Sequence, residues 1–230
     1  MKKNPKITYL VMVYNEIRTI KKAIKDVLNI NYKNKEILVI DNGSTDGSRD
    51  VINNFKNIKK ILRKENLGAG KTIEEGIKKA KGSYIYIQYS DLEFDHLQSL
   101  DMLNYAKKNN LDIVLGSRLM KKNIWKELNK KKSYLATIIT TFIINKFYNK
   151  EFTDIIGSKL YRTSEVRKIP ITSYGVGFDW EFISRACKRN LKIGEISVKY
   201  KPRLYQHEKK IRFYNIFNAI YELFKVKLFE

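Results

Sequence analysis

Short apolar runs alternate with amphipathic stretches along the first half of the chain. A short apolar run bounded by turn residues predicts a buried strand, and apolar residues spaced three and four apart predict a helix. These patterns place strands at residues 7–13, 36–40, 58–62, 84–87 and 113–115, and helices at 18–28, 48–55, 71–80 and 97–108. Strands that alternate with helices predict an α/β fold whose mostly parallel sheet is flanked by helices.

The second half is less regular. Its patterns predict helices at 133–148 and 179–188 and strands at 158–161 and 192–199. The polar, lysine-rich stretch 123–132 has no clear period, which is typical of a mobile loop over a site. No linker or repeat divides the chain, so we expect one domain over residues 1–230.

The last helix, predicted at 211–229, is rich in aromatic and aliphatic residues and carries Lys225 and Lys227 near its end. Such a helix packs on the sheet, or it lies in a membrane interface with its apolar side in the lipid. We expect its first half to pack on the sheet and leave both interpretations open for its end.

The composition is strongly basic: 46 Lys and Arg face 24 Asp and Glu, for a formal net charge of +22. This excess predicts an anionic partner, such as a nucleic acid, an anionic membrane face or a phosphorylated substrate. No zinc-ligand spacing, helix-turn-helix or RNA-binding motif accompanies the charge, so we expect no nucleic-acid partner.

Three further features concern the compartment. The lone Cys187 excludes an intramolecular disulfide framework and fits a reducing compartment. No secretory leader pattern precedes the first strand. The longest apolar stretch, 135–147, is shorter than the roughly 20 residues that a membrane span needs. We therefore expect a soluble or peripheral protein of the cytoplasm.

The stretch Gln88–Asp95 (QYSDLEFD) holds three carboxylates, Asp91, Glu93 and Asp95, directly after a predicted buried strand. Ligands of α/β sheets bind at the carboxyl ends of the strands. Carboxylates two apart in a loop can converge on one hard cation, which prefers oxygen ligands. The alternative is a solvated turn in which Asp95 caps the next helix.

Other loops follow the earlier strands. Asn15 can cap the helix after the first strand, and Asp41 ends the second strand, where a carboxylate suits a base imide or a ribose. The glycines of 66–71 lack the spacing of a P-loop, and no GxGxxG follows the first strand. The same lack of a glycine-rich loop after the first strand argues against a nucleotidyltransferase.

These motifs, in this order, resemble glycosyltransferase family 2. The resemblance covers nearly the whole chain and rests on YNE (14–16), VIDNGSTDGS (39–48), NLGAGKTIEEGIKKAKGSYI (66–85), QYSDLEFD (88–95), GSRL (116–119), DIIGSKLYR (154–162) and GFDWEFISRA (177–186). The tail IGEISVKYKPRLYQHEKKI (193–211) is similar to the polyprenyl-phosphate, or dolichyl-phosphate, mannosyl- and glucosyltransferase branch.

The resemblance implies the GT-A fold, a nucleotide-diphospho-sugar transferase fold, and an enzyme that inverts the anomeric centre. It implies transfer of a hexose from a UDP- or GDP-sugar to a polyprenyl phosphate at an anionic membrane face. The alternatives are a family 2 transferase that acts on a sugar hydroxyl in surface-polysaccharide or cell-envelope glycan synthesis, and a degenerate, non-catalytic relative.

The resemblance also implies residue roles on the donor side. Tyr14, Asn15 and Glu16 line the nucleotide pocket, Asp41 contacts the base, and Lys71 lies near the ribose or diphosphate. Asp91 is placed beside the sugar and the metal, and Glu93 is the second metal ligand. The implied cofactor is Mg²⁺ or Mn²⁺, which binds one or two carboxylates together with phosphate oxygens.

Basic residues and further acids complete the implied site. Arg118 and Arg203 are candidates for the diphosphate, and Lys209 and Lys210 for the acceptor phosphate. Asp154 is the candidate for acceptor positioning or for a general base. Asp179 and Glu181 rank behind it, because residues two apart in a helix do not share a face.

Tyr89 departs from the family pattern, because it stands where the first acid of the Asp-x-Asp motif is expected. A neutral phenol with a pKa of about 10 is a poor ligand for a hard cation. Either Asp91 and Glu93 bind the metal together with the diphosphate, or metal use is weak.

Overall fold

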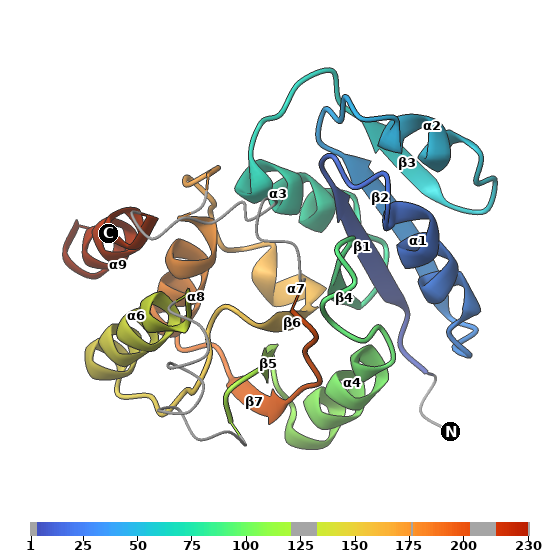
Figure 1. Ribbon diagram of the computed structural model, residues 1–230. Helices are drawn as coiled ribbons and strands as arrows, with labels where there is room; N and C mark the ends of the chain where they lie inside the picture. Colours follow the sequence, from blue (N-terminus) through green and yellow to red (C-terminus); the bar gives the residue numbers. More distant parts are fainter. Residues whose placement is uncertain (1–3, 121–132, 176, 203–214, 230) are drawn as a thin grey trace.

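One mixed β-sheet forms the centre of the molecule (Figure 1). The computed structural model describes residues 4–120, 133–175, 177–202 and 215–229. Within these ranges seven strands lie in the order β3-β2-β1-β4-β6-β5-β7. They are β1 Ile7–Val13, β2 Lys35–Asp41, β3 Lys59–Leu62, β4 Tyr84–Tyr89, β5 Ile113–Ser117, β6 Ser158–Arg162 and β7 Ile193–Ser197. β6 runs antiparallel to both of its neighbours, and the other pairs are parallel.

Helices flank both faces of this sheet. They are α1 Ile20–Asn29, α2 Ser48–Asn53, α3 Ala69–Lys79, α4 Gln98–Asn109, α6 Ser133–Tyr148, α7 Thr163–Val166, α8 Phe178–Lys188 and α9 Asn215–Phe229. The first half of α9 was expected to pack on the sheet, whereas this helix packs on α8 and α6 (Figure 1). The expected α/β fold with a mostly parallel sheet is confirmed. Each predicted helix and strand is found within two residues of its expected bounds, except that the start of the last helix falls outside the described residues. The short helix α7 was not predicted, and the stretch 123–132 also lies outside the described residues.

The sheet separates two apolar cores, because alternate side chains of a strand point to opposite faces. Tyr9 and Val11 of β1 pack in one core with α1 and α4, and Leu10 of the same strand packs in the other with α3 and α8. A strand buried on both faces reads as a continuous apolar run. For this reason the strands of the first half were recognisable from the sequence.

The carboxyl ends of the parallel strands converge on one edge of the sheet. β1, β2 and β4 lie side by side and end at Val13, Asp41 and Tyr89, so the loops that follow them emerge together. The N-terminus of α3 lies against the segment before α8, where the amide of Gly70 donates a 3.0 Å hydrogen bond to the carbonyl of Tyr174. This edge therefore collects the sequence motifs from both halves of the chain.

Candidate active site

The loops after β1 and β2 are joined by four hydrogen bonds from backbone amides to side-chain oxygens. The amide of Asn15 donates to the hydroxyl of Ser44 (2.9 Å), and the amide of Thr45 donates to the side-chain oxygen of Asn15 (2.8 Å). The amides of Glu16 and Ile17 donate to Ser48 Oγ and to Asp46, each at 2.9 Å. Asn15 adopts a positive φ of 54° in this arrangement. Instead of capping α1 with its side chain, Asn15 connects the two loops.

Of the three residues predicted to line a nucleotide pocket, only Asn15 is exposed. Tyr14 is half-buried, and Glu16 is buried at the start of the turn into α1. The Glu16 carboxylate accepts a 3.1 Å hydrogen bond from the hydroxyl of Thr19. Glu16 thus shapes the loop from within, and Tyr14 and Asn15 present the surface that a nucleotide would meet.

Asp41 ends β2 with a fully buried side chain. One of its carboxylate oxygens accepts from Nε and Nη2 of Arg49 at 3.1 and 3.0 Å, and the other accepts from the amide of Ser44 at 3.2 Å. Arg49 was not predicted, since a lone arginine on a short surface helix carries no signal in the sequence. The pair sets the conformation of the 42–48 loop, which is the surface where the base was expected.

Arg63 is a second residue that the sequence did not reveal. It follows β3 and is largely buried, and its guanidinium donates to Glu75 Oε2, to Asn42 Oδ1 (2.8 Å) and to the carbonyl of Lys71 (3.1 Å). It therefore joins the loop after β2 to the first turn of α3. Arg63 holds in one arrangement the two segments assigned to base and diphosphate.

The glycines before α3 serve a close approach between backbones. Gly68 has a φ of +88°, and a Cβ on it would lie 2.0 Å from the carbonyl oxygen of Tyr174. A Cβ on Gly70 would lie 2.2 Å from the carbonyl oxygen of Ser173. These glycines thus allow the backbone of the segment before α8 to approach closely. From the sequence, a ligand was expected to approach them. Lys71, half-exposed on the first turn, contacts Glu74 (2.7 Å) and lies over the ring of Tyr174 (4.6 Å).

The acidic loop after β4 holds Asp91 and Glu93 partly exposed at the sheet edge. Asp91 Oδ1 accepts from the amide of Glu93 at 3.1 Å, so the two residues share one tight turn. Glu93 Oε2 accepts a 2.9 Å hydrogen bond from the hydroxyl of Tyr200, and Phe94 forms an isolated β-bridge with Tyr200. The segment after β7 therefore braces this loop.

Asp95 was offered as a cap of the next helix, but α4 begins at Gln98 and its N-cap residue is Leu97. The Asp95 carboxylate accepts from the amide of Leu97 at 3.0 Å, at the turn that leads into α4. The acidic stretch therefore divides: Asp95 supports the turn, whereas Asp91 and Glu93 lie before it at the edge of the sheet.

Arg118 and Asp154 form a buried ion pair beside this loop. Nε and Nη2 of Arg118 donate to the two carboxylate oxygens at 2.7 and 3.0 Å, and the amide of Arg118 donates to Oδ2 at 3.0 Å. The guanidinium also lies 5.3 Å from the ring centre of Tyr200. Arg118 is therefore fixed close to the acidic loop.

The placement of Asp154 argues against its predicted role as a base. The side chain is fully buried, and burial alone would raise its pKa, but Arg118 and the surrounding amides hold the pKa below its ordinary value. A general base must reach the proton that it removes and must bind it near the working pH. We therefore reassign Asp154 as the residue that positions Arg118.

Asp179 and Glu181 lie on different faces of α8, as their spacing of two residues predicted, and have different surroundings. Glu181 is fully buried and accepts from the amides of Thr172 and Ser173, so it supports the segment before α8. Asp179 is half-buried in the first turn of α8, and its Oδ1 lies 2.9 Å from Nζ of the buried Lys159. Asp179 thus becomes a stronger site candidate than the sequence suggested.

Tyr89 fills the position of the missing first acid. Its ring packs on the core and against Phe94, with ring centres 5.9 Å apart. Burial, together with the carboxylates of Asp179 and Asp91, raises the pKa of Tyr89 well above its ordinary value. The phenol therefore stays neutral, and it lies within electrostatic range of both acids.

The donor set fits a divalent cation that is completed by a ligand. Asp91 and Glu93 supply carboxylate oxygens from one turn, and among the described residues no group of three or more His, Cys, Asp or Glu side chains is arranged to hold a metal. Mg²⁺ commonly takes one or two carboxylates plus substrate phosphate oxygens. The site is therefore suited to a cation that arrives with a diphosphate.

The model of a known protein family, described as glycosyl transferase family 2, matches residues 8–169, which include the loops after β1 and β2 and the acidic loop after β4. The chain belongs to glycosyl transferase family 2. The resemblance stated from the sequence is thereby confirmed.

Known relatives within glycosyl transferase family 2 have different names. A dolichyl-phosphate beta-glucosyltransferase of Dictyostelium discoideum is 28% identical over 84% of this chain and 66% of its own. A cholesterol galactosyltransferase of Borreliella burgdorferi is 31% identical over 47% of this chain, and a poly-beta-1,6-N-acetyl-D-glucosamine synthase of Staphylococcus epidermidis is 32% identical over 45%. The chain spans only 31% and 26% of the length of the last two.

Solved structures confirm the GT-A fold. Glucosyl-3-phosphoglycerate synthase from Mycobacterium tuberculosis, in complex with Mn²⁺, UDP and glucosyl-3-phosphoglycerate, matches with a TM-score of 0.73 at 14% identity. The match covers 98% of this chain and 81% of that one.

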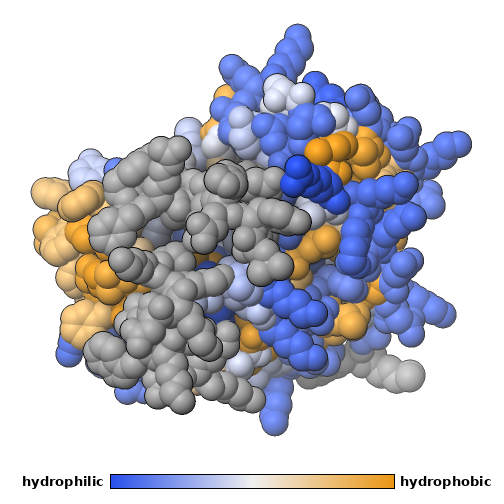
Figure 2. All heavy atoms as spheres, viewed as in Figure 1, coloured by the Kyte–Doolittle hydropathy of each residue, from blue (hydrophilic) through white to orange (hydrophobic). Residues whose placement is uncertain are grey.

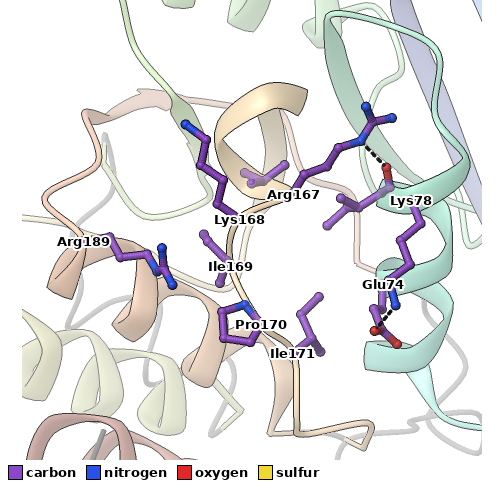
Figure 3. Close-up of a pocket in the computed structure, with 10 residues that line it drawn as sticks. Glu74, Lys78, Arg167, Lys168, Ile169, Pro170, Ile171 and Arg189 are labelled. Carbon is purple, nitrogen blue, oxygen red and sulfur yellow. Dashed lines mark hydrogen bonds and ion pairs between the residues drawn. The ribbon is translucent and has the colours of Figure 1, made fainter.

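Three predicted residues of this family 2 member, Arg203, Lys209 and Lys210, lie outside the described residues. A hollow of about 480 Å³ lies elsewhere, between α3, the segment 166–171 and Arg189 (Figure 3). None of the predicted site residues lines it, and Lys78 and Arg167 at its rim are bonded to Glu74 and to backbone carbonyls. The candidate active site is thus the sheet edge and not this hollow.

Proposed function

We propose that this chain, as one domain over residues 1–230, transfers a hexose from a UDP- or GDP-sugar to a polyprenyl phosphate with inversion. The observation that carries the proposal is the pairing of Asp91 and Glu93 at the carboxyl edge with the fixed guanidinium of Arg118 beside them. The similarity to a dolichyl-phosphate beta-glucosyltransferase over 84% of the chain supports a lipid-phosphate acceptor.

The donor half of the site is assigned to the hydrogen-bonded loops after β1 and β2. Tyr14 and Asn15 would face the nucleoside, and the loop shaped by Asp41 would contact the base. Lys71 is proposed near the ribose or diphosphate. Asp91 and Glu93 would hold Mg²⁺ or Mn²⁺, and a cation bound there supplies charge stabilisation to the leaving diphosphate.

The chemistry is one displacement at the anomeric carbon. An oxygen of the acceptor attacks this carbon from the side opposite the diphosphate, and the bond to the diphosphate breaks with its electron pair going to the leaving group. Arg118 lies where it can offset charge that develops on the diphosphate. A lipid phosphate is already anionic near neutral pH, so this acceptor requires no general base.

The acceptor half remains with the basic tail. Arg203, Lys209 and Lys210 are proposed to contact the diphosphate and the acceptor phosphate. A lipid acceptor lies in a bilayer, and we propose that the protein acts at the cytoplasmic face of a membrane as a peripheral protein, with no nucleic-acid partner. Within the described ranges, no helix has the length and apolar character to span a bilayer.

A second candidate function is transfer to a sugar hydroxyl in surface-polysaccharide synthesis, and Asp179 favours it. A hydroxyl nucleophile needs a base to remove its proton. Asp179 is a half-buried carboxylate, and both Asp179 and Asp91 lie within electrostatic range of Tyr89. In this reaction Asp179 would accept the hydroxyl proton. A degenerate, non-catalytic protein would bind donor without transferring the sugar.

One assay set tests these alternatives. Purified protein is incubated with radiolabelled UDP- or GDP-hexose, Mn²⁺ and a short polyprenyl phosphate, and label is counted in the organic phase. The proposal predicts organic-phase label that depends on the lipid and is reduced less than ten-fold in Asp179→Asn. Label found only in added glycan, with a roughly 100-fold loss in Asp179→Asn, would favour the hydroxyl acceptor. Absence of transfer from every donor would overturn the proposal that this protein is an active transferase.

A further inference from the structure

Helix α9 is apolar on two sides. Ile216, Ala219, Leu223 and Val226, which are spaced three and four apart, are buried against the rest of the protein. A second stripe with the same kind of spacing faces outward: Phe217 (70% exposed), Tyr221 (64%), Phe224 (42%) and Leu228 (64%). A contiguous exposed apolar patch on a soluble protein commonly marks an interaction site. We therefore expect the outward stripe of α9 to be covered by a partner.

Helix α6 extends this apolar surface. It packs beside α9, with the rings of Phe147 and Phe224 edge to face at 5.0 Å, and it exposes Leu135 (38%) and Phe142 (59%). Figure 2 shows apolar side chains gathered at the left edge of the molecule, where Figure 1 places α6 and α9. We call the outward stripe of α9 together with Leu135 and Phe142 the outer apolar face.

Cations accompany the outer apolar face. Lys146 lies 5.5 Å from the ring centre of Phe142, and Lys227 donates to the carbonyl of Phe147 at 2.8 Å. Along α6 and α9, Lys146, Lys225 and Lys227 stand against one acid, Glu222, which is 3.4 Å from Lys225. Aromatic side chains with lysines at their margin are typical of helices that lie in the interface of an anionic bilayer.

We propose that the outer apolar face docks on an anionic lipid bilayer, with α6 and α9 lying along its surface. A second copy of the chain fits less well, because a two-fold contact places the same patch of both molecules together. The same lysines would then face each other in two proteins of formal net charge +22. An anionic bilayer instead attracts these lysines and takes up the aromatic side chains.

The docking face is connected to the candidate site through α8. Glu222 in the middle of α9 lies against Gly177, since a Cβ placed on that glycine would be 2.8 Å from Cγ of Glu222. Asp179 follows two residues later in the first turn of α8. The inference rests on the proposed function in one respect only: a lipid acceptor would explain why the protein binds a bilayer. The face itself is argued from its own residues.

Vesicle flotation tests the proposal without donor or acceptor. The 230-residue protein is mixed with phosphatidylcholine vesicles that contain or lack phosphatidylglycerol, and contain no polyprenyl phosphate. We expect binding to the anionic vesicles that weakens with added salt. The affinity of the triple variant Phe217→Ser, Tyr221→Ser, Leu228→Ser for the anionic vesicles should be at least roughly ten-fold lower, because three apolar side chains that would enter the lipid are removed.

Controls separate the surface from the fold and from the enzyme. Phe217→Ser alone is compared with Leu97→Ser, which removes an equally apolar side chain, 53% exposed, from the far end of the acidic loop. We expect only the first to weaken flotation, with thermal unfolding unchanged in both. Nucleotide-sugar binding without vesicles should be the same in the triple variant and the wild type.

Three results would overturn the proposal. They are equal flotation of the triple variant and the wild type, no flotation of the wild type, and a wild-type dimer by light scattering that the triple variant converts to monomer. Failure of donor binding, with flotation as expected, would instead sink the proposed function and leave the docking face standing.

Discussion

The hydroxyl of Tyr200 donates a 2.9 Å hydrogen bond to the carboxylate of Glu93 across 107 positions of the chain. The ring of the same tyrosine lies under the guanidinium of Arg118, which Asp154 holds in turn. One tyrosine thus links the proposed cation ligand to the proposed diphosphate contact. The segment after β7 therefore supports the proposed donor site.

Tyr200→Phe should weaken cation use while leaving the fold intact. The substitution removes the hydroxyl that orients Glu93 and keeps the ring beneath Arg118. Loss of a partner that orients a metal ligand typically costs roughly 10- to 100-fold in metal affinity. We expect the Mn²⁺ concentration for half-maximal donor binding to rise by about ten-fold, as measured by calorimetry.

Tyr148→Phe is the matched control for this change. It also removes one phenolic hydroxyl, which forms a 2.6 Å hydrogen bond with Ser184 on α8, far from the acidic loop in the sequence. An equal shift in the two variants would mean that Tyr200 acts through general stability and has no special relation to Glu93.

Asp154→Asn should destabilise the protein strongly near neutral pH. The substitution leaves the guanidinium of Arg118 buried without its counter-charge, which typically costs about 3–5 kcal/mol. We expect a correspondingly lower urea midpoint for this variant than for Asp26→Asn, which breaks a surface i,i+4 pair with Lys22 and removes a carboxylate 3.7 Å from His96. A loss below about 1 kcal/mol would contradict the positioning role, because exposed pairs contribute no more than that.

The same pair predicts a dependence on pH. The folded pKa of Asp154 is held below its ordinary value, so its contribution is complete above the unfolded pKa of about 3.9 and is lost as the pH falls through the folded pKa. Wild-type stability should therefore fall in acid below about pH 4, and the difference between wild type and Asp154→Asn should shrink there. A difference that stays constant to low pH would contradict this assignment.

Tyr89→Asp restores the first acid of the family motif and should nevertheless be harmful. The new carboxylate would lie on the core and close to the carboxylates of Asp91 and Asp179, which already oppose ionisation of Tyr89. We expect a loss of about 3 kcal/mol in unfolding free energy and no gain in Mn²⁺ affinity. Tyr89→Phe is the control and should be close to neutral, and tighter Mn²⁺ binding in Tyr89→Asp would refute this interpretation.

The fold could be predicted from the sequence because both faces of the sheet are covered. β1 and β4 are largely apolar for that reason, and the loops between them carry turn residues that mark the boundaries. The helix α7 has only four residues, which is too short to show an apolar period. Its backbone is supported instead by tertiary contacts that the sequence does not display.

The site was predictable only as a set of loops. The sequence proposed Asp91, Glu93 and Arg118, since each lies in a loop that follows a strand at the carboxyl edge. It did not identify Arg49, Arg63 or Tyr200, because their roles come from partners that are distant in the chain or, for Arg49, from a local pair that resembles a solvated charge. The ion pair of Asp154 was missed for the same reason: its partner Arg118 lies 36 residues away.

Metal-dependent donor binding by Asp91→Asn tests the central claim, that Asp91 and Glu93 form the cation and diphosphate corner of the donor site. Calorimetry with UDP- and GDP-sugars is run with and without Mn²⁺ on the wild type, on Asp91→Asn and on Asp95→Asn, which makes the same charge change in the same loop at the residue that supports the turn. We predict Mn²⁺-dependent binding in the wild type and in Asp95→Asn, and a loss of the Mn²⁺ dependence in Asp91→Asn. Mn²⁺-dependent binding of wild-type strength in Asp91→Asn would contradict the account.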